Sequence, residues 1–221
     1  MSLNRGGIAV AGGKNENRTF SHAPLPASSG TAEKQLIAIG ASTGGTEAIA
    51  AIFKDLAPPL PPIVIVQHIP PLFSSYFSRR LDAISRISVK EAEDGDVLQS
   101  SHAYVAPGGQ HMKVVRQGGR LALACAKGDP VNWVCPSVDV LFFSVAEIVG
   151  PAAVGVILTG MGADGAKGLF AMRRKGALTF GQDAASSVVY GMPRAAFELG
   201  SVERQMPLAA IAGAIRVAVR G

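Results

Sequence analysis

Four short runs of apolar residues, each followed by a segment with helical periodicity, dictate the fold class of this chain. The runs occupy residues 36–40, 63–67, 154–158 and 177–180, and the helical segments occupy 46–56, 74–81, 166–175 and 193–199. The runs are apolar at successive positions, which is typical of strands that are buried on both faces. Such strands, alternating with helices, predict an α/β fold whose parallel sheet is covered on both sides.

The middle of the chain interrupts this alternation. Short segments at 102–106, 111–115 and 121–124 are separated by the turns Pro107-Gly108-Gly109 and Gly118-Gly119. Glycine turns at this interval predict a meander of antiparallel strands. We therefore expect a doubly wound, mainly parallel, three-layer sheet of Rossmann-like type, with a β-hairpin insertion at about 102–125.

The chain divides at a change in composition near Lys34-Gln35. Residues 1–34 are rich in Gly, Ser, Pro, Ala and Asn and lack a periodic apolar pattern, which is typical of a flexible linker or tail. Residues 35–221 carry the α/β pattern, and we expect them to form one domain.

Composition narrows the possible function classes. The net charge is +5, but the basic residues are scattered. The densest groups, Arg79-Arg80 and Arg173-Arg174-Lys175, fall at the apparent ends of helices, where cations complement the helix dipole. We therefore expect no nucleic-acid partner. Cys125, Cys135 and the four histidines lack the spacing of a zinc site or a disulfide framework, so no metal and no cofactor is expected.

The sequence also carries no sign of a membrane or secretory role. No apolar run approaches the ~18–20 residues that a membrane-spanning helix needs. The first residues, MSLNRGGIAVAGGKNENR, lack a signal-peptide pattern. We expect a cytoplasmic protein without membrane insertion.

The loop Gly40-Ala41-Ser42-Thr43-Gly44-Gly45 lies between a predicted buried strand and a predicted helix. In a parallel α/β sheet, ligands bind at the carboxyl ends of the strands. A glycine-rich turn there can expose a nucleophilic hydroxyl, bind a phosphate group, or simply reverse the chain. The loop lacks both the GxGxxG order and a Walker lysine, but by itself it leaves these three interpretations open.

Two further polar residues follow other predicted strands. His68 comes directly after the run 63–67, and Asp164 follows the run 154–158. Each has an ordinary alternative, because His68 can be a surface residue at a Pro-Pro turn and Asp164 can cap a helix. Together with Ser42, they supply the nucleophile, base and carboxylate of a serine hydrolase at three strand ends. Their chain order, Ser, His, Asp, differs from the order Ser, Asp, His of an α/β-hydrolase.

Several motifs resemble the catalytic domain of the chemotaxis receptor methylesterases, the CheB family. The motifs include IAIGASTGGTEAI, VQHIPPLFSSYFSRRLD, AYVAPGGQHM, PSVDVLFFSVA and GVILTGMGADGAKGL, and the similarity covers residues 35–200. The resemblance implies hydrolysis of glutamate γ-methyl esters on the cytoplasmic helices of chemoreceptors, with release of methanol, and deamidation of receptor glutamines. It places the nucleophile at Ser42, the general base at His68 and the acid partner at Asp164. It assigns the arrangement of the site to Thr43 and Met161, and it implies a monomer.

The chain departs from the pattern of this family in two respects. Only 34 residues precede the predicted domain, too few for the receiver domain that family members usually carry. We therefore expect either that the chain is a fragment of a longer regulator that carries this domain, or that its activity is controlled differently from that of other family members. Where the family commonly has two arginines, this chain has Trp133 and Cys135. We expect these residues to lie near the substrate, although Trp133 can instead cover the hairpin. A nucleotide-binding module and a catalytically silent docking domain are the alternative functions.

Overall fold

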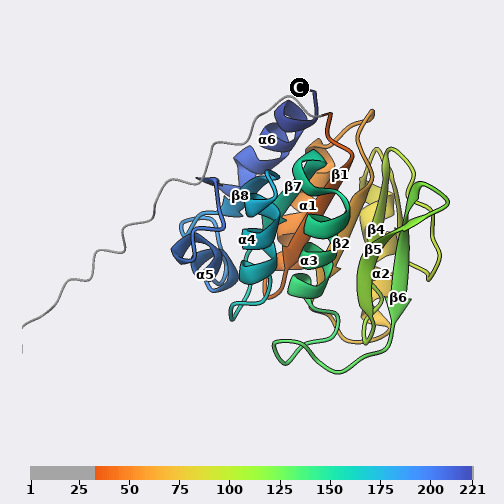
Figure 1. The fold of residues 1–221 in the computed structure, drawn as a ribbon. Helices are drawn as coiled ribbons and strands as arrows, with labels where there is room; N and C mark the ends of the chain where they lie inside the picture. The colour runs from red at the N-terminus through yellow and green to blue at the C-terminus, as the bar shows by residue number, and fades with distance from the viewer. Residues whose placement is uncertain (1–32, 221) are drawn as a thin grey trace, which may run out of the picture.

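The computed structural model describes residues 33–220. Within them a seven-stranded sheet has the order β3-β4-β2-β1-β7-β8-β9, and a two-stranded sheet pairs β5 with β6 (Figure 1). The strands are β1 (Leu36–Ala41), β2 (Ile63–Gln67), β3 (Ser88–Glu91), β4 (His102–Val105), β5 (His111–Gln117), β6 (Arg120–Ala126), β7 (Ala153–Ile157), β8 (Leu178–Gln182) and β9 (Arg204–Met206). The helices are α1 (Gly45–Asp55), α2 (Phe73–Ile84), α3 (Val138–Ile148), η1 (Gly150–Ala152), α4 (Ala166–Arg174), α5 (Met192–Glu198) and α6 (Leu208–Arg220).

The predicted fold class is confirmed. Every pair of neighbouring strands in the large sheet is parallel. The four predicted apolar runs form β1, β2, β7 and β8, and the four predicted helical segments form α1, α2, α4 and α5, with bounds that differ by a few residues at most. The predicted tail, 1–34, lies outside the described residues except for its last two.

Successive side chains of β1 enter two different hydrophobic cores. Leu36 and Ala38 pack on the face covered by α3, α4 and α5, whereas Ile37 and Ile39 pack on the face covered by α1, α2 and α6. All four side chains are fully buried. Because each strand side chain is enclosed by helices, the sequence of the strand shows no polar alternation.

The assignment of 102–106 to an antiparallel meander is wrong. His102–Val105 forms β4, which lies between β3 and β2 and pairs in parallel with both. The turn Pro107-Gly108-Gly109 resembles a hairpin turn in sequence, but the amide of Gly108 donates to the hydroxyl of Ser74 in α2. A strand of four residues carries too little periodicity to reveal which neighbour it pairs with.

The rest of the predicted insertion is a true hairpin. β5 and β6 pair in antiparallel register from His111–Ala126 to Gln117–Arg120. Gly118 and Gly119 connect them, and both have positive φ, of 57° and 80°. A two-residue turn of this kind matches the right-handed twist of the strands. The hairpin packs against α3 on one side of the large sheet (Figure 1).

The two basic groups differ in their placement. Arg173 and Arg174 occupy the last turn of α4, as predicted. Arg79 and Arg80 lie inside α2, whose last turn has no basic residue, so the predicted position of this pair is wrong. Arg80 forms an ion pair with Glu47 of α1, and Arg79 lies over the ring of Tyr76. The two arginines therefore interact with side chains and not with the carboxyl end of the helix dipole.

Candidate functional site

The three polar residues that follow the predicted strands lie at the ends of adjacent strands. Ser42 follows β1, His68 follows β2, and Asp164 lies in the loop after β7, and these strands have the order β2-β1-β7. The chain leaves β1 toward β2 and later returns to its other side at β7. This reversal is a topological switch point, where α/β sheets open a crevice.

The main chain of Ser42 is held on both sides. Its amide donates to the carbonyl of Thr159 at 3.0 Å, which joins the ends of β1 and β7. Its carbonyl accepts from the amide of Gly45 at 2.8 Å and from the side-chain amide of Gln67 at 2.8 Å. The turn is therefore rigid at the hydroxyl-bearing residue, and the side chain is half-buried.

His68 and Asp164 form a hydrogen-bonded pair. Nε2 of His68 lies 2.8 Å from Oδ2 of Asp164, and the side chains are 12% and 4% exposed. Among the hydrogen bonds of the described residues, 33–220, none joins the hydroxyl of Ser42 to the ring of His68, which is bonded to Asp164. Nucleophile–base contacts are often long before substrate binds, so the unbound geometry is compatible with a later contact.

Asp164 accepts hydrogen bonds from several groups besides His68. Oδ1 accepts from the Asn132 side chain at 2.6 Å, the Ser137 hydroxyl at 2.7 Å and the Asp139 amide at 3.2 Å, and Oδ2 accepts from the Val138 amide at 2.6 Å. Burial by itself would raise the pKa of Asp164, but hydrogen bonds from His68, Asn132, Ser137 and Val138 outweigh burial and lower it. The carboxylate is therefore kept ionised in a buried position.

A cavity of about 430 Å³ opens over these residues. It is lined by Ser42, Thr43, His68, Asn132, Trp133, Val134, Met161, Gly162, Ala163 and Asp164. The structure thus brings together all the predicted site residues except Cys135, which follows the lining residue Val134 and is half-buried. Trp133 is 97% exposed and does not cover the hairpin.

Sequence reasoning missed the residues that hold the carboxylate. These residues lie just before or at the start of α3, and they are Asn132, Ser137 and Asp139. Most positions of α3 are apolar, so its sequence lacks the polar face that would reveal a helix by periodicity. One signal was present: Ser137 is an N-cap, whose hydroxyl accepts from the amide of Val140. Gln67, which fixes the carbonyl of Ser42, has no signal in the sequence beyond its place at the end of a buried strand.

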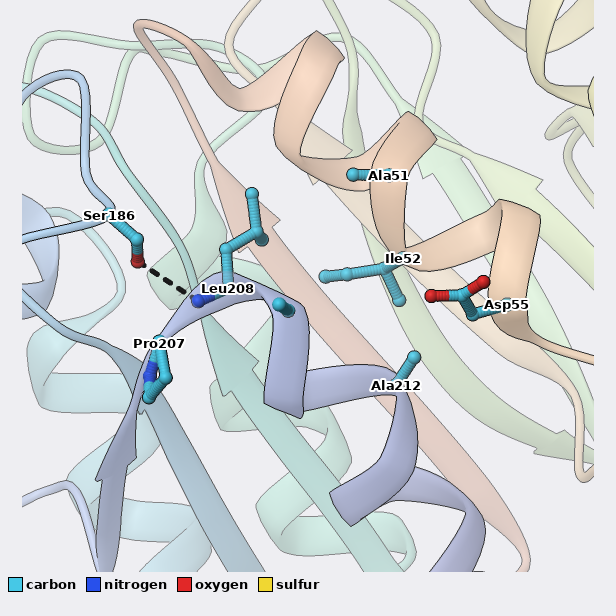
Figure 2. A pocket seen from close by; sticks show the side chains of 8 residues that line it. Ala51, Ile52, Asp55, Ser186, Pro207, Leu208 and Ala212 are labelled. Atoms are coloured by element: carbon cyan, nitrogen blue, oxygen red, sulfur yellow. Dashed lines mark hydrogen bonds between the residues drawn. The ribbon is translucent and has the colours of Figure 1, made fainter.

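A second hollow, of about 340 Å³, lies between α1 and α6 (Figure 2). Its lining is mostly apolar and includes Ala51, Ile52, Leu208 and Ala212. The hydroxyl of Ser186 accepts a hydrogen bond from the amide of Leu208, as the dashed line in Figure 2 shows. No histidine lines this hollow, so it lacks the base that a serine nucleophile needs.

Two negative findings concern the described part of the chain. No helix between residues 33 and 220 is long and apolar enough to cross a membrane. Over the same residues, no group of three or more His, Cys, Asp or Glu side chains is arranged to hold a metal ion.

The fold and the site define an α/β protein with a serine–histidine–aspartate cluster at the switch point of a parallel sheet. The CheB methylesterase family model matches residues 37–215, and the chain belongs to this family. The chain is 55% identical over 181 residues to protein-glutamate methylesterase/protein-glutamine glutaminase 1 of Caulobacter vibrioides. The aligned region covers 81% of the chain and 52% of that protein. It is also 51% identical over 202 residues to protein-glutamate methylesterase/protein-glutamine glutaminase of Gluconobacter oxydans. That alignment covers 87% of the chain and 58% of the relative.

A solved structure supports the same assignment. The crystal structure of the Thermotoga maritima CheB methylesterase catalytic domain superposes with a TM-score of 0.80 at 37% identity, covering 83% of this chain and 98% of that one. The chain spans about half the length of the two named relatives. These names favour the hydrolase interpretation over the nucleotide-binding one.

Proposed function

We propose that the chain hydrolyses γ-methyl esters of glutamate side chains on chemotaxis receptors and releases methanol. The observation that carries the proposal is the convergence of Ser42, His68 and Asp164 on one cavity, with His68 bonded to a carboxylate that is kept ionised. Family membership and the names of the relatives support the substrate class. The same acyl-transfer chemistry would deamidate receptor glutamines.

We infer a reaction in which each of the three residues has one role. Because Nε2 of His68 binds Asp164, Nδ1 is the ring nitrogen that takes the proton from the Ser42 hydroxyl. Oγ of Ser42 then attacks the ester carbonyl, and methanol leaves with the proton that His68 returns. Water repeats the sequence on the acyl-enzyme, which frees the glutamate and Ser42. General-base catalysis of this kind contributes about 10²–10⁴-fold.

The negative charge of the tetrahedral intermediate needs hydrogen-bond donors. We assign the main-chain amide of Met161 to this role, since Met161 lines the cavity between Gly160 and Gly162. Thr43 lines the cavity beside the nucleophile, and its carbonyl accepts from the hydroxyl of Thr159, which fixes the turn. One oxyanion donor is worth about 10²–10³-fold in turnover.

The remaining features of the function complete the proposal. The partners are the cytoplasmic helices of methyl-accepting chemotaxis receptors, and the chain acts in the cytoplasm as a monomer. A receiver domain in a longer protein is a further proposed partner. Trp133 and Cys135 lie on the segment that contacts the substrate.

The test uses the 221-residue chain and a peptide that carries a glutamyl γ-methyl ester. We expect methanol release by the native chain and a loss of about 10⁴-fold or more in Ser42→Ala. A serine-directed phosphonate should label the native chain at Ser42. Ser100→Ala, which alters an exposed serine outside the cavity, is the matched control and should keep full activity. Turnover in a folded Ser42→Ala equal to that of the native chain would refute the proposal.

A further inference from the structure

Trp133 combines two features that do not benefit folding. Its side chain is 97% exposed, the largest fraction among the exposed large hydrophobic residues between positions 33 and 220. Its backbone is left-handed, with φ of 67°, and so is that of Asn132, with φ of 54°. Asparagine tolerates this region, but a bulky tryptophan is strained in it, and strain of this kind gathers at functional sites. An indole held in water on a strained backbone points to a role outside the fold.

The loop that carries Trp133 is nevertheless tightly held. Val131 and Val134 exchange two main-chain hydrogen bonds of 3.1 Å around it. The side-chain amide of Asn132 donates to Asp139 at 2.8 Å and to Asp164 at 2.6 Å. The residue before Trp133 is therefore bonded directly to the carboxylate that binds His68, which fixes the loop relative to the reacting groups.

Trp133 also lines the cavity that contains Ser42 and His68. Met161 lines the same cavity and is 75% exposed. Two large, uncharged side chains thus line the cavity that contains Ser42 and remain mostly exposed to solvent. A polypeptide that presents its ester to Ser42 must pass against them.

We propose that Trp133 is a specificity-determining residue that selects targets with an apolar side chain next to the esterified glutamate. The inference rests on the proposed function and names the kind of sequence that the site prefers. On a helical target, apolar residues three or four positions from the ester share its face and would lie against the indole. Tryptophan is among the residues that most often dominate an interface energetically.

The test compares three methyl esters. One is a small ester of N-acetylglutamate amide, which fills only the cavity; the others are helical peptides with the ester at one position and either Leu or Ser three and four residues later. In Trp133→Ala we expect kcat/KM for the Leu peptide to fall about tenfold or more. The small ester and the Ser peptide should lose several-fold less than the Leu peptide, because neither places an apolar side chain against the indole, and Trp133→Phe should restore most of the loss.

Phe197→Ala provides the matched control, because Phe197 is a half-exposed aromatic residue on α5 that does not line the cavity. It should leave all three rates unchanged. Equal changes of the three rates in Trp133→Ala, whether losses or gains, would overturn the inference, as would no change with the Leu peptide. If the native chain cleaves none of the esters, both this inference and the proposed function fail. If it cleaves them without discrimination by Trp133, only this inference fails.

Discussion

His68 binds Asp164 through Nε2, at 2.8 Å from Oδ2, so the nitrogen that remains for the proposed proton transfer from Ser42 is Nδ1. With Asp164 ionised, Nε2 carries the proton of the pair and Nδ1 is left unprotonated, as a base requires. The carboxylate therefore sets the tautomer of the imidazole, and its own position is set by the donors from Asn132, Ser137 and the start of α3.

Asp164→Asn tests this dependence. In the variant an NH₂ group replaces one carboxylate oxygen, and each oxygen of Asp164 accepts at least two hydrogen bonds. If the NH₂ faces His68, it donates to Nε2 and moves the ring proton to Nδ1, the wrong tautomer for a base. We expect ester hydrolysis to fall by about 10⁴-fold and the free energy of unfolding to fall by about 1–3 kcal/mol. Turnover and denaturant unfolding, measured on the same samples, check both values.

The pH dependence of stability should follow the lowered pKa of Asp164. Because the folded-state pKa lies below the unfolded value of about 3.9, ionised Asp164 stabilises the fold fully above that pH. The stabilisation is lost as the pH falls through the folded-state pKa. The difference in unfolding free energy between the native chain and Asp164→Asn should therefore shrink below about pH 4. A difference that stays constant down to acid unfolding would contradict this account.

Asp139 offers a control of opposite sign. Burial raises its pKa, and this effect exceeds the opposing hydrogen bonds from Gly168 and Asn132. The ionised carboxylate therefore opposes folding above its folded-state pKa, and that penalty disappears as the pH falls through it. Relative to Asp139→Asn, the native chain should gain stability on acidification, whereas relative to Asp164→Asn it should lose stability.

The sequence was sufficient to predict that the three proposed reacting groups lie together. Ser42, His68 and Asp164 each follow a run that is apolar on both faces, and the carboxyl ends of parallel strands meet at one edge of a sheet. The placement of β4 could not be predicted, because its pairing depends on partners at 63–65 and 88–91 that are remote in sequence. The donors to Asp164 were missed for a similar reason: Asn132 and Ser137 bond to a residue about 30 positions away, which local patterns do not reveal.

Asn132→Gly isolates the contribution of the amide that joins Asp139 and Asp164. Glycine adopts the φ of 54° without strain, so the variant removes the hydrogen bonds of 2.8 and 2.6 Å and adds only the greater flexibility of the unfolded chain. Two buried carboxylates then lose a shared donor, and we expect the free energy of unfolding to drop by about 1–3 kcal/mol. Hydrolysis should fall as well, because Asp164 is less well positioned.

Asn132→Ala separates the hydrogen bonds from the backbone strain. Alanine also lacks the amide, but it must adopt the left-handed conformation, which costs it about 1–2 kcal/mol more. Thermal or denaturant unfolding should therefore rank the native chain first, Asn132→Gly second and Asn132→Ala third. If the two variants were equally stable, the left-handed backbone would not be a source of strain.

Gly160→Ala should displace Ser42, the proposed nucleophile, through packing alone. A Cβ at Gly160 would overlap the sulfur of Met192 and lie 2.7 Å from Cβ and 3.0 Å from the amide nitrogen of Ser42. The loop after β7, which contains Gly160, would have to move away from Ser42. This movement would strain the hydrogen bond between the Ser42 amide and the Thr159 carbonyl. We expect the free energy of unfolding to fall by about 1–3 kcal/mol, the usual cost of overpacking, and hydrolysis to fall by at least about 10²-fold, since an error of 1 Å in position costs that much.

Gly213→Ala is the matched change at a distant glycine. Gly213 lies inside α6, and an added Cβ would meet only Arg216, at 4.0 Å. Since alanine favours a helix over glycine by about 1 kcal/mol, this variant should be more stable than the native chain and equally active.

Crystal structures or hydrogen exchange of the Gly160→Ala variant should show the change at the Ser42 turn. If Gly160→Ala kept the native turnover, the spacing between the loops after β1 and β7 would not determine the reactivity of Ser42.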